Sequence, residues 1–204
     1  NAHRDLQRKL NMGNLDSFVA SPVFVKLPLR DTRRLPATKK ELSYPILLPH
    51  EFLSVMYENN RTIFDTFIVG AGSLLGFWSH VREGDPRLSG HPVKRKADKS
   101  RVVPLRIHGD GVPMGKGKNK SMDILSFSSM SGLPGCTWDT NILTFAIVSD
   151  AKFPGGASGP ATMLLVWKVL LWSFEACQKV EHPAFDLDGE SFEHKDPERW
   201  RRRG

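Results

Sequence analysis

The stretch RVVPLRIHGDGVPMGKGKNKSMDILSFSS, residues Arg101–Ser129, decides the fold that the sequence predicts. It begins with the β-rich run VVPLRIHG, passes through Asp110 between two glycines, and reaches a second β-rich run after a segment rich in lysine and glycine. Apolar runs with partial alternation are typical of strands, and clusters of Gly, Asn and Asp are typical of turns. The stretch therefore predicts two neighbouring strands joined by a loop.

A third strand and a long helix follow this pair. Residues 141–150, NILTFAIVSD, have a nearly continuous apolar centre, and a segment rich in glycine and proline separates them from the apolar helix predicted over 161–179. This helix is shorter than a usual membrane span and contains Lys168 and Glu175, so we expect it to pack against the sheet. The predicted order is β-β-β-α over residues 102–182, in an α+β or α/β fold.

The rest of the chain divides by composition. Residues 1–48 mix basic clusters with prolines, which predicts a solvated arm of extended or irregular chain. Residues 49–90 carry apolar side chains at helical spacing and predict a helical segment, and residues 91–101 form a basic linker. Residues 183–204 are polar, and we expect a tail there.

The charge of the chain favours polyanionic partners. Its 29 lysines and arginines against 22 acids give a formal net charge of +7, so nucleic acid is the first class of partner to consider. Cys136 and Cys177 are the only cysteines, without the spacing of a zinc site, which predicts a reducing, intracellular location, nuclear or cytoplasmic. We expect no membrane partner, and we expect the chain to be a fragment of a longer product.

Two phosphate-binding motifs can be tested on the loop after the first strand. A Walker loop needs GxxxxGK followed by Ser or Thr, but the spacing from Gly109 or Gly111 is wrong and Lys116 precedes Gly117. The dinucleotide fingerprint GxGxxG fails as well, because Met114 stands where its third glycine belongs. Neither motif predicts nucleotide binding here.

Two interpretations of Asp110 remain open on local chemistry. An aspartate at the end of a central strand can hold a divalent metal, and lysines in the following turn can meet phosphates. An aspartate between glycines is also a common turn signal in an ordinary hairpin. His108 lies two positions earlier, so on a strand it would share a face with Asp110. The candidate nucleic-acid contacts are Lys94, Arg95, Lys96, Lys116, Lys118 and Lys120, with Arg201, Arg202 and Arg203 as further candidates.

Other acidic residues are better explained as turns. Asp139 and Asp150 flank the third strand and are expected to be strand-end polar residues. The segment DLDGE, with Asp186 and Asp188, is similar to half an EF-hand loop, but Ala184 stands where the first acid would be. We therefore expect a surface turn there.

The order β-β-β-α with Asp110 in IHGDG on its first strand resembles the opening of the ribonuclease H-like fold of DDE transposases and retroviral-type integrases. The segments IHGDGVP and TWDTNILTFAIVSD also resemble uncharacterised multicopy proteins of transposon ancestry. The resemblance covers residues 102–179. It implies that Asp110 is a catalytic ligand of Mg²⁺ or Mn²⁺, and that nucleic acid, DNA rather than RNA, is the partner. No later segment matches the family's other two acids, so no metal is expected to bind tightly to this incomplete core.

Three functions are therefore compared. The first is a nucleic-acid-binding, transposase-derived fragment whose metal-dependent phosphodiester chemistry would require a longer intact form. The second is a non-enzymatic basic binding or interaction module in which Asp110 only shapes a turn. The third is a product with no retained activity. A longer reading frame with an apolar strand ending in Asp or Glu would favour the enzyme.

Overall fold

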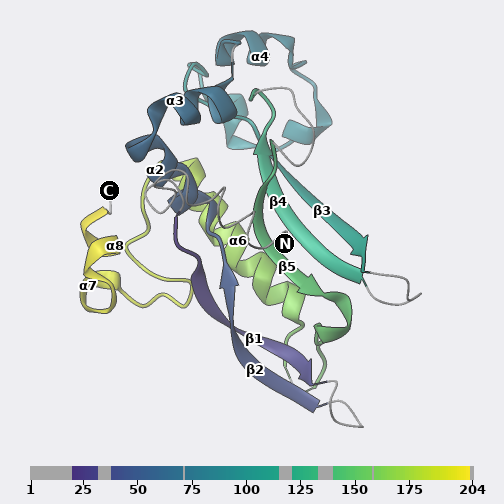
Figure 1. The fold of residues 1–204 in the computed structure, drawn as a ribbon. Coiled ribbons are helices and arrows are strands. Elements are labelled where there is room, and N and C mark those ends of the chain that lie inside the picture. Colours follow the sequence, from purple (N-terminus) through teal and green to yellow (C-terminus); the bar gives the residue numbers. More distant parts are fainter. Residues whose placement is uncertain are drawn as a thin grey trace, which may run out of the picture.

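The computed structural model shows a mixed α+β fold with a two-stranded and a three-stranded antiparallel sheet (Figure 1). It describes residues 20–31, 38–70, 72–114, 121–132, 140–157 and 159–202. In chain order, with η for 3₁₀ or π turns, the elements are β1 (Val23–Asp31), β2 (Thr38–Ile46), α2 (Pro49–Asn59), α3 (Arg61–Phe64), η2 (Asp65–Val69), α4 (Leu74–His80), η3 (Pro86–Leu88), η4 (Pro92–Arg95), β3 (Leu105–Pro113), β4 (Ser121–Ser129), β5 (Ile142–Val148), η5 (Ser149–Ala151), α6 (Thr162–Lys179), α7 (Phe192–Lys195) and α8 (Pro197–Arg202).

The three strands predicted from the central stretch are adjacent in one sheet, which confirms that prediction. Their order is β3-β4-β5, both pairs are antiparallel, and Asp110 lies opposite Ile124. β4 is the central strand, and Leu125 and Phe127 on it are buried. β3 is an edge strand and is mostly exposed. The α+β class is thus established. The order of these strands does not by itself show a ribonuclease H-like fold.

The predicted long helix is α6, and it packs against the sheet as expected. Val166 and Leu170 on α6 share one core cluster with Leu125 of β4 and with Phe145 and Ile147 of β5. This contact joins the helix to β4 and β5 because their apolar side chains point to the same face.

One face of α6 is nevertheless uncovered. Leu164 is 61% exposed and Leu171 is 56% exposed. They stand seven residues apart, so both lie on one stripe of the helix, together with exposed Lys168 and Glu175. The expectation that apolar packing covers most of the circumference of α6 is wrong for this stripe.

The structure corrects the prediction for the N-terminal region. Residues 23–31 and 38–46, expected to be an irregular solvated arm, form the antiparallel pair β1–β2. Leu27, Leu29 and Ile46 of this pair belong to the same core cluster as α6. The charges that suggested an arm occupy exposed positions of the strands, so they do not prevent the leucines from being buried.

The hairpin also lies along the three-stranded sheet. The backbone N–H of Leu47, just after β2, donates to the carbonyl of Thr144 on β5 at 2.9 Å, and the Tyr44 hydroxyl donates to the carbonyl of Ala146 at 2.6 Å. Leu29 of β1 forms an isolated antiparallel bridge with Lys152. These contacts hold the hairpin beside β5, on the side of the molecule away from β3 (Figure 1).

The structure also corrects the prediction for residues 183–204, because they form more than a polar tail. Phe192 on α7 is only 3% exposed. Arg199 on α8 forms an ion pair with Glu51 on α2 at 2.6 Å. The segment therefore folds back onto α2. Its polar composition did not predict this packing.

Residues 61–80 are long and apolar enough to cross a membrane by composition, and little of the segment is buried. The structure divides this segment among α3, η2 and α4. Gly70 and Ser73, between η2 and α4, have extended or left-handed rather than helical backbone conformations. The segment is therefore not one continuous helix among the described residues.

Candidate functional site

Asp110 lies in the middle of β3 with its side chain exposed. Its neighbour two positions earlier, His108, is exposed on the same face of the strand. Within the part of the chain that the structure describes, no hydrogen bond or ion pair involves the Asp110 carboxylate. Asp110 is therefore on a strand and not at the tip of a turn.

The nearest acid on the neighbouring strand does not join Asp110. Asp123 lies opposite Gly111, so its side chain is on the other face of the sheet. It accepts a hydrogen bond from Ser149 Oγ at 2.6 Å and pairs with Lys152. Burial acts to raise the pKa of Asp123, but these two hydrogen bonds outweigh it and hold the pKa below its usual value. Asp123 is thus already neutralised by its own lysine.

The described residues do not fit the divalent metal that the resemblance implies. Among them, no group of three or more His, Cys, Asp or Glu side chains could hold a metal ion. A catalytic Mg²⁺ site needs several oxygen ligands around one ion, and Asp110 supplies one carboxylate. Asp150 lies in the exposed first turn of η5, and Asp139 lies outside the described residues.

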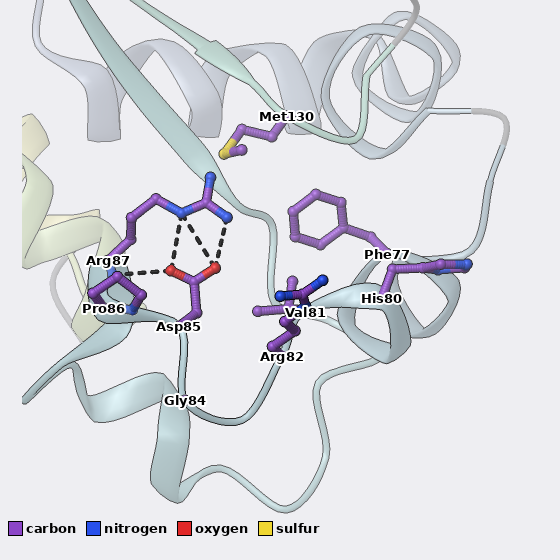
Figure 2. Close-up of a pocket in the computed structure, with 9 residues that line it drawn as sticks. All are labelled: Phe77, His80, Val81, Arg82, Gly84, Asp85, Pro86, Arg87 and Met130. Carbon is purple, nitrogen blue, oxygen red and sulfur yellow. Dashed lines mark hydrogen bonds and ion pairs between the residues drawn. The ribbon is translucent and has the colours of Figure 1, made fainter.

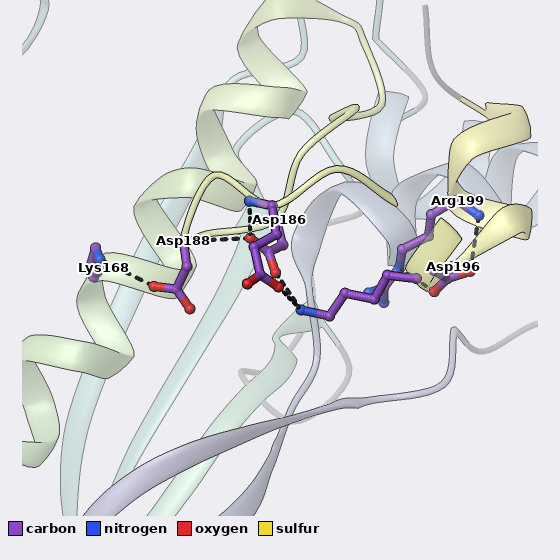
Figure 3. A network of polar contacts seen from close by, with 7 residues as sticks. Lys168, Asp186, Asp188, Asp196 and Arg199 are labelled. Atoms are coloured by element: carbon purple, nitrogen blue, oxygen red, sulfur yellow. Dashed lines mark hydrogen bonds and ion pairs between the residues drawn. The ribbon is translucent and has the colours of Figure 1, made fainter. Parts of the chain in front are cut away.

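The acids near the C-terminus form the surface turn that the sequence predicted. Asp186 Oδ1 accepts the backbone N–H groups of Asp188 and Glu190, both at 2.9 Å. Lys195 Nζ donates to Asp186 Oδ2 at 2.7 Å and to Glu190 Oε2 at 3.0 Å (Figure 3). A lysine ammonium therefore stands among these carboxylates.

Three of the predicted basic residues lie together on the surface. Lys94 and Arg95 are in η4 and Lys96 caps it, and all three side chains are exposed. Val93, directly before them, is only 4% exposed, so it anchors the turn. Lys116, Lys118, Lys120 and Arg203 lie outside the described residues, and Arg201 and Arg202 are exposed on α8.

A cavity of about 890 Å³ lies beside this turn (Figure 2). Its apolar wall comes from Phe77 and Val81 at the end of α4 and from Met130 after β4. Its polar lining includes two exposed guanidinium groups, those of Arg82 and Arg87. The full lining is Phe77, His80, Val81, Arg82, Gly84, Asp85, Pro86, Arg87 and Met130.

Local hydrogen bonds hold the cavity wall. Asp85 accepts the backbone N–H of Arg87 at 2.9 Å and pairs with its guanidinium at 2.6 Å. The hydrogen bonds from Arg87, together with the nearby charge of Lys94, lower the pKa of Asp85 to about 2. Trp78, edge-on to Phe77 with ring centroids 5.2 Å apart, donates from Nε1 to the carbonyl of Val102 at 2.8 Å. Asp85, on which the charge of Lys94 acts, and Phe77 line the same cavity.

This cavity was not expected from the sequence, which predicts only a helical segment over residues 49–90. The available signal was the placement of Phe77 and Trp78 directly before Arg82 and Arg87.

A buried polar cluster also went unnoticed. His50 Nδ1 lies 2.8 Å from Ser173 Oγ on α6, and His182 Nε2 lies 3.0 Å from Ser54 Oγ on α2. The Ser173 hydroxyl accepts the backbone N–H of His50 at 3.2 Å, which leaves its own proton for Nδ1. Burial, followed by the charges of His182 and Arg199, lowers the pKa of His50 to about 3. Ser173 and His50 are both buried, so the contact between them lies in the interior of the fold.

Comparison with known proteins gives no matching family model, no matching curated protein and no matching solved structure.

Proposed function

We propose that this chain binds nucleic acid through its basic segment, residues 80–101, and the adjoining cavity. Lys94, Arg95 and Lys96 contact the phosphates, and the Phe77 cavity receives an unpaired base. DNA is the expected partner, with little sequence preference. The observation that carries the proposal is three consecutive exposed cations beside a cavity with an aromatic wall and two guanidinium groups.

The distribution of charge supports this surface. Residues 80–101 contain seven lysines and arginines against three acids, so four of the seven net positive charges of the chain lie in this segment. Of the three acids, Asp85 is held by Arg87 and Asp98 accepts the backbone N–H of Ser100. Exposed cations of this kind displace counterions from a phosphate backbone without needing a formed groove.

The cavity wall supports a preference for single strands. Proteins that bind single strands without sequence preference combine a basic surface with aromatic side chains on which bases stack. Phe77 supplies an aromatic ring of this kind, and Arg82 and Arg87 supply planar cations beside it. In a duplex the bases are already stacked on one another, so the cavity would contribute little.

The first test removes three charges. The triple variant Lys94→Gln, Arg95→Gln, Lys96→Gln is expected to bind labelled single-stranded DNA more weakly, and its dependence of log affinity on log salt is expected to flatten by about 0.7 per lost phosphate contact. Titrations at several salt concentrations measure both. The matched control is Lys26→Gln, Arg30→Gln, Lys40→Gln, which removes the same charge from exposed positions of the β1–β2 hairpin. Equal losses in the two triple variants would show that only net charge matters and would contradict the proposed surface.

The second test concerns the aromatic wall. Phe77→Leu keeps an apolar side chain but removes the stacking surface, and we expect it to weaken binding of single-stranded DNA about tenfold, because stacking on one base contributes about 1–3 kcal/mol. Binding of a duplex of the same length is expected to change little. An equal loss of affinity for both forms, or no loss for either, would contradict the proposal that a base stacks on Phe77 in the cavity.

Metal-dependent phosphodiester chemistry is a separate proposal for a longer form. It is supported by the position of Asp110 on the first of three antiparallel strands followed by α6, the order that the resemblance implies. Because the described residues form no metal site, no catalytic step is assigned to them. Cleavage of DNA by a longer form with Mg²⁺ or Mn²⁺, lost in Asp110→Asn, is the expected result, and cleavage that persists in this variant would contradict it.

A further inference from the structure

β3 leaves one edge of the three-stranded sheet open. Among the described strands it pairs with β4 alone, and residues 106–111 are exposed on both faces (Figure 1). Natural proteins protect such edges with prolines, bulges, charges or a covering segment, because an open edge is a template for another strand. Here prolines stand only at the limits, at Pro104 and Pro113. The edge between them has a regular, unbroken register with β4.

The register shows which backbone groups face the open edge. The N–H of Met130 donates to the carbonyl of Pro104 at 2.8 Å, so this opposed pair is hydrogen-bonded. Hydrogen-bonded and non-hydrogen-bonded pairs alternate along an antiparallel ladder. The even-numbered residues of β3 therefore bond to β4, and the odd-numbered residues direct their N–H and C=O groups outward. The residues with outward groups are Leu105, Ile107, Gly109 and Gly111.

We propose that this edge is a dimer interface, in which β3 pairs antiparallel with β3 of a second copy about a two-fold axis at His108. In this register Ile107 lies opposite the partner's Gly109, and Leu105 lies opposite the partner's Gly111. All four outward-facing residues of each copy then exchange backbone hydrogen bonds, about eight in total. The two sheets become one continuous sheet of six strands.

Charge complementarity selects a second copy as the occupant. The register places Arg106 directly opposite the partner's Asp110, and symmetry repeats this pair on the other side of the axis. Opposite charges at such cross-strand positions stabilise a sheet, and like charges destabilise it. Arg106 Nε donates to Ser128 Oγ at 2.7 Å, but a guanidinium has further donors for a carboxylate. The exposed carboxylate of Asp110 has no ion-pair partner among the described residues. In the dimer it would pair with the guanidinium of the partner's Arg106.

Shape complementarity points the same way. Ile107 is 45% exposed, and it lies on the face of the sheet that carries Phe127. The partner's Gly109 has no side chain of its own there, so the isoleucine lies over the partner's backbone and beside the partner's Leu125, which is on the same face. The two copies of Ile107 become diagonal neighbours across the axis, which removes apolar surface of both from water.

Other registers lack this match. Sliding the strands by two residues in one direction places Asp110 opposite the partner's Pro104 and leaves both charges without a counterpart. Sliding them in the other direction places Leu105 opposite the partner's Pro113, which has no N–H to donate. The register centred on His108 is therefore favoured by backbone and side chains together.

The test is a charge swap in the whole chain, measured by sedimentation equilibrium. The parent chain is expected to be a dimer, and Asp110→Arg or Arg106→Asp alone should raise the dimer dissociation constant about tenfold or more, since each sets like charges opposite each other twice. The double variant Arg106→Asp, Asp110→Arg restores both pairs with reversed polarity and should return the constant to within about threefold of the parent. Asp150→Arg, an exposed acid on η5, controls for the change in net charge.

Two results would overturn the proposal. One is a parent chain that stays monomeric up to about 100 µM, a concentration at which even a weak specific interface is populated. The other is a double variant as dissociated as the single variants, with unchanged far-ultraviolet circular dichroism in all of them. Neither result bears on nucleic-acid binding, which is measured separately through Lys94, Arg95 and Lys96.

Discussion

Replacing Phe127 with alanine is expected to lower the free energy of unfolding by about 3–5 kcal/mol, the usual cost of removing a buried aromatic ring. Phe127 lies on the central strand β4 and is fully buried. Its ring is edge-on to Phe52 of α2, with centroids 6.2 Å apart, and to Phe174 of α6, with centroids 5.9 Å apart. The substitution thus removes the contact at which sheet, α2 and α6 meet.

Urea denaturation of the whole chain measures this change. The matched control is Leu143→Ala, on the neighbouring strand β5, where the side chain is 53% exposed and the expected loss is below about 1 kcal/mol. Phe127→Leu should lie between the two, because leucine refills part of the space. A similar loss for Phe127→Ala and Leu143→Ala would mean that the three elements are not held together by this ring.

Acid is expected to destabilise the fold through His50. Its pKa in the folded chain is about 3, because of burial and then the nearby charges of His182 and Arg199, whereas an unfolded histidine titrates near 6.5. Below pH 6.5 the unfolded chain therefore binds a proton that the folded chain does not. The contribution of His50 is fully present above pH 6.5 and is lost by up to about 1.4 kcal/mol per pH unit as the pH falls towards 3.

The measurement is the free energy of unfolding between about pH 7.5 and 5.5, above the range in which most carboxylates titrate. The slope should flatten in His50→Gln and stay steep in His194→Gln, which changes an exposed histidine on α7. Burial also lowers the pKa of His182, so a residual slope from that side chain is expected in His50→Gln. Identical slopes in the parent and His50→Gln would show that His50 does not carry the effect.

The core of the fold was predictable where periodicity was strong. The strands around Asp110 and the helix now seen as α6 were correctly expected because their apolar runs are long and end at glycine, proline or lysine clusters. The β1–β2 hairpin was missed because its prolines and charges dominate the composition. Its few buried positions, such as Leu27 and Leu29, are buried because they pack in the same core cluster as α6, and this contact is not visible in the local sequence.

The candidate site was predictable only in part. Lys94, Arg95 and Lys96 were named from charge alone, and the structure places them on an exposed turn. Asp110 was expected either at the end of a central strand or in a hairpin turn, and the structure places it in the middle of the edge strand β3. Its neighbours across the sheet could not be known, and the described acids do not gather around it. The Phe77 cavity combines α4 and η3, which are neighbours in the chain, with Met130 after β4, which is distant from both.

The sequence by itself determined the local elements: the β-β-β-α order, the apolar character of α6 and the basic segment before β3. These follow from side-chain periodicity, glycine and proline positions and charge, all of which act over a few neighbouring residues. Only the tertiary structure decided that β3 is an edge strand, that Arg199 reaches Glu51 and that His50 is buried against Ser173. These features depend on which distant segments exclude water from one another, and burial, strand order and the pKa of His50 are properties of that packing.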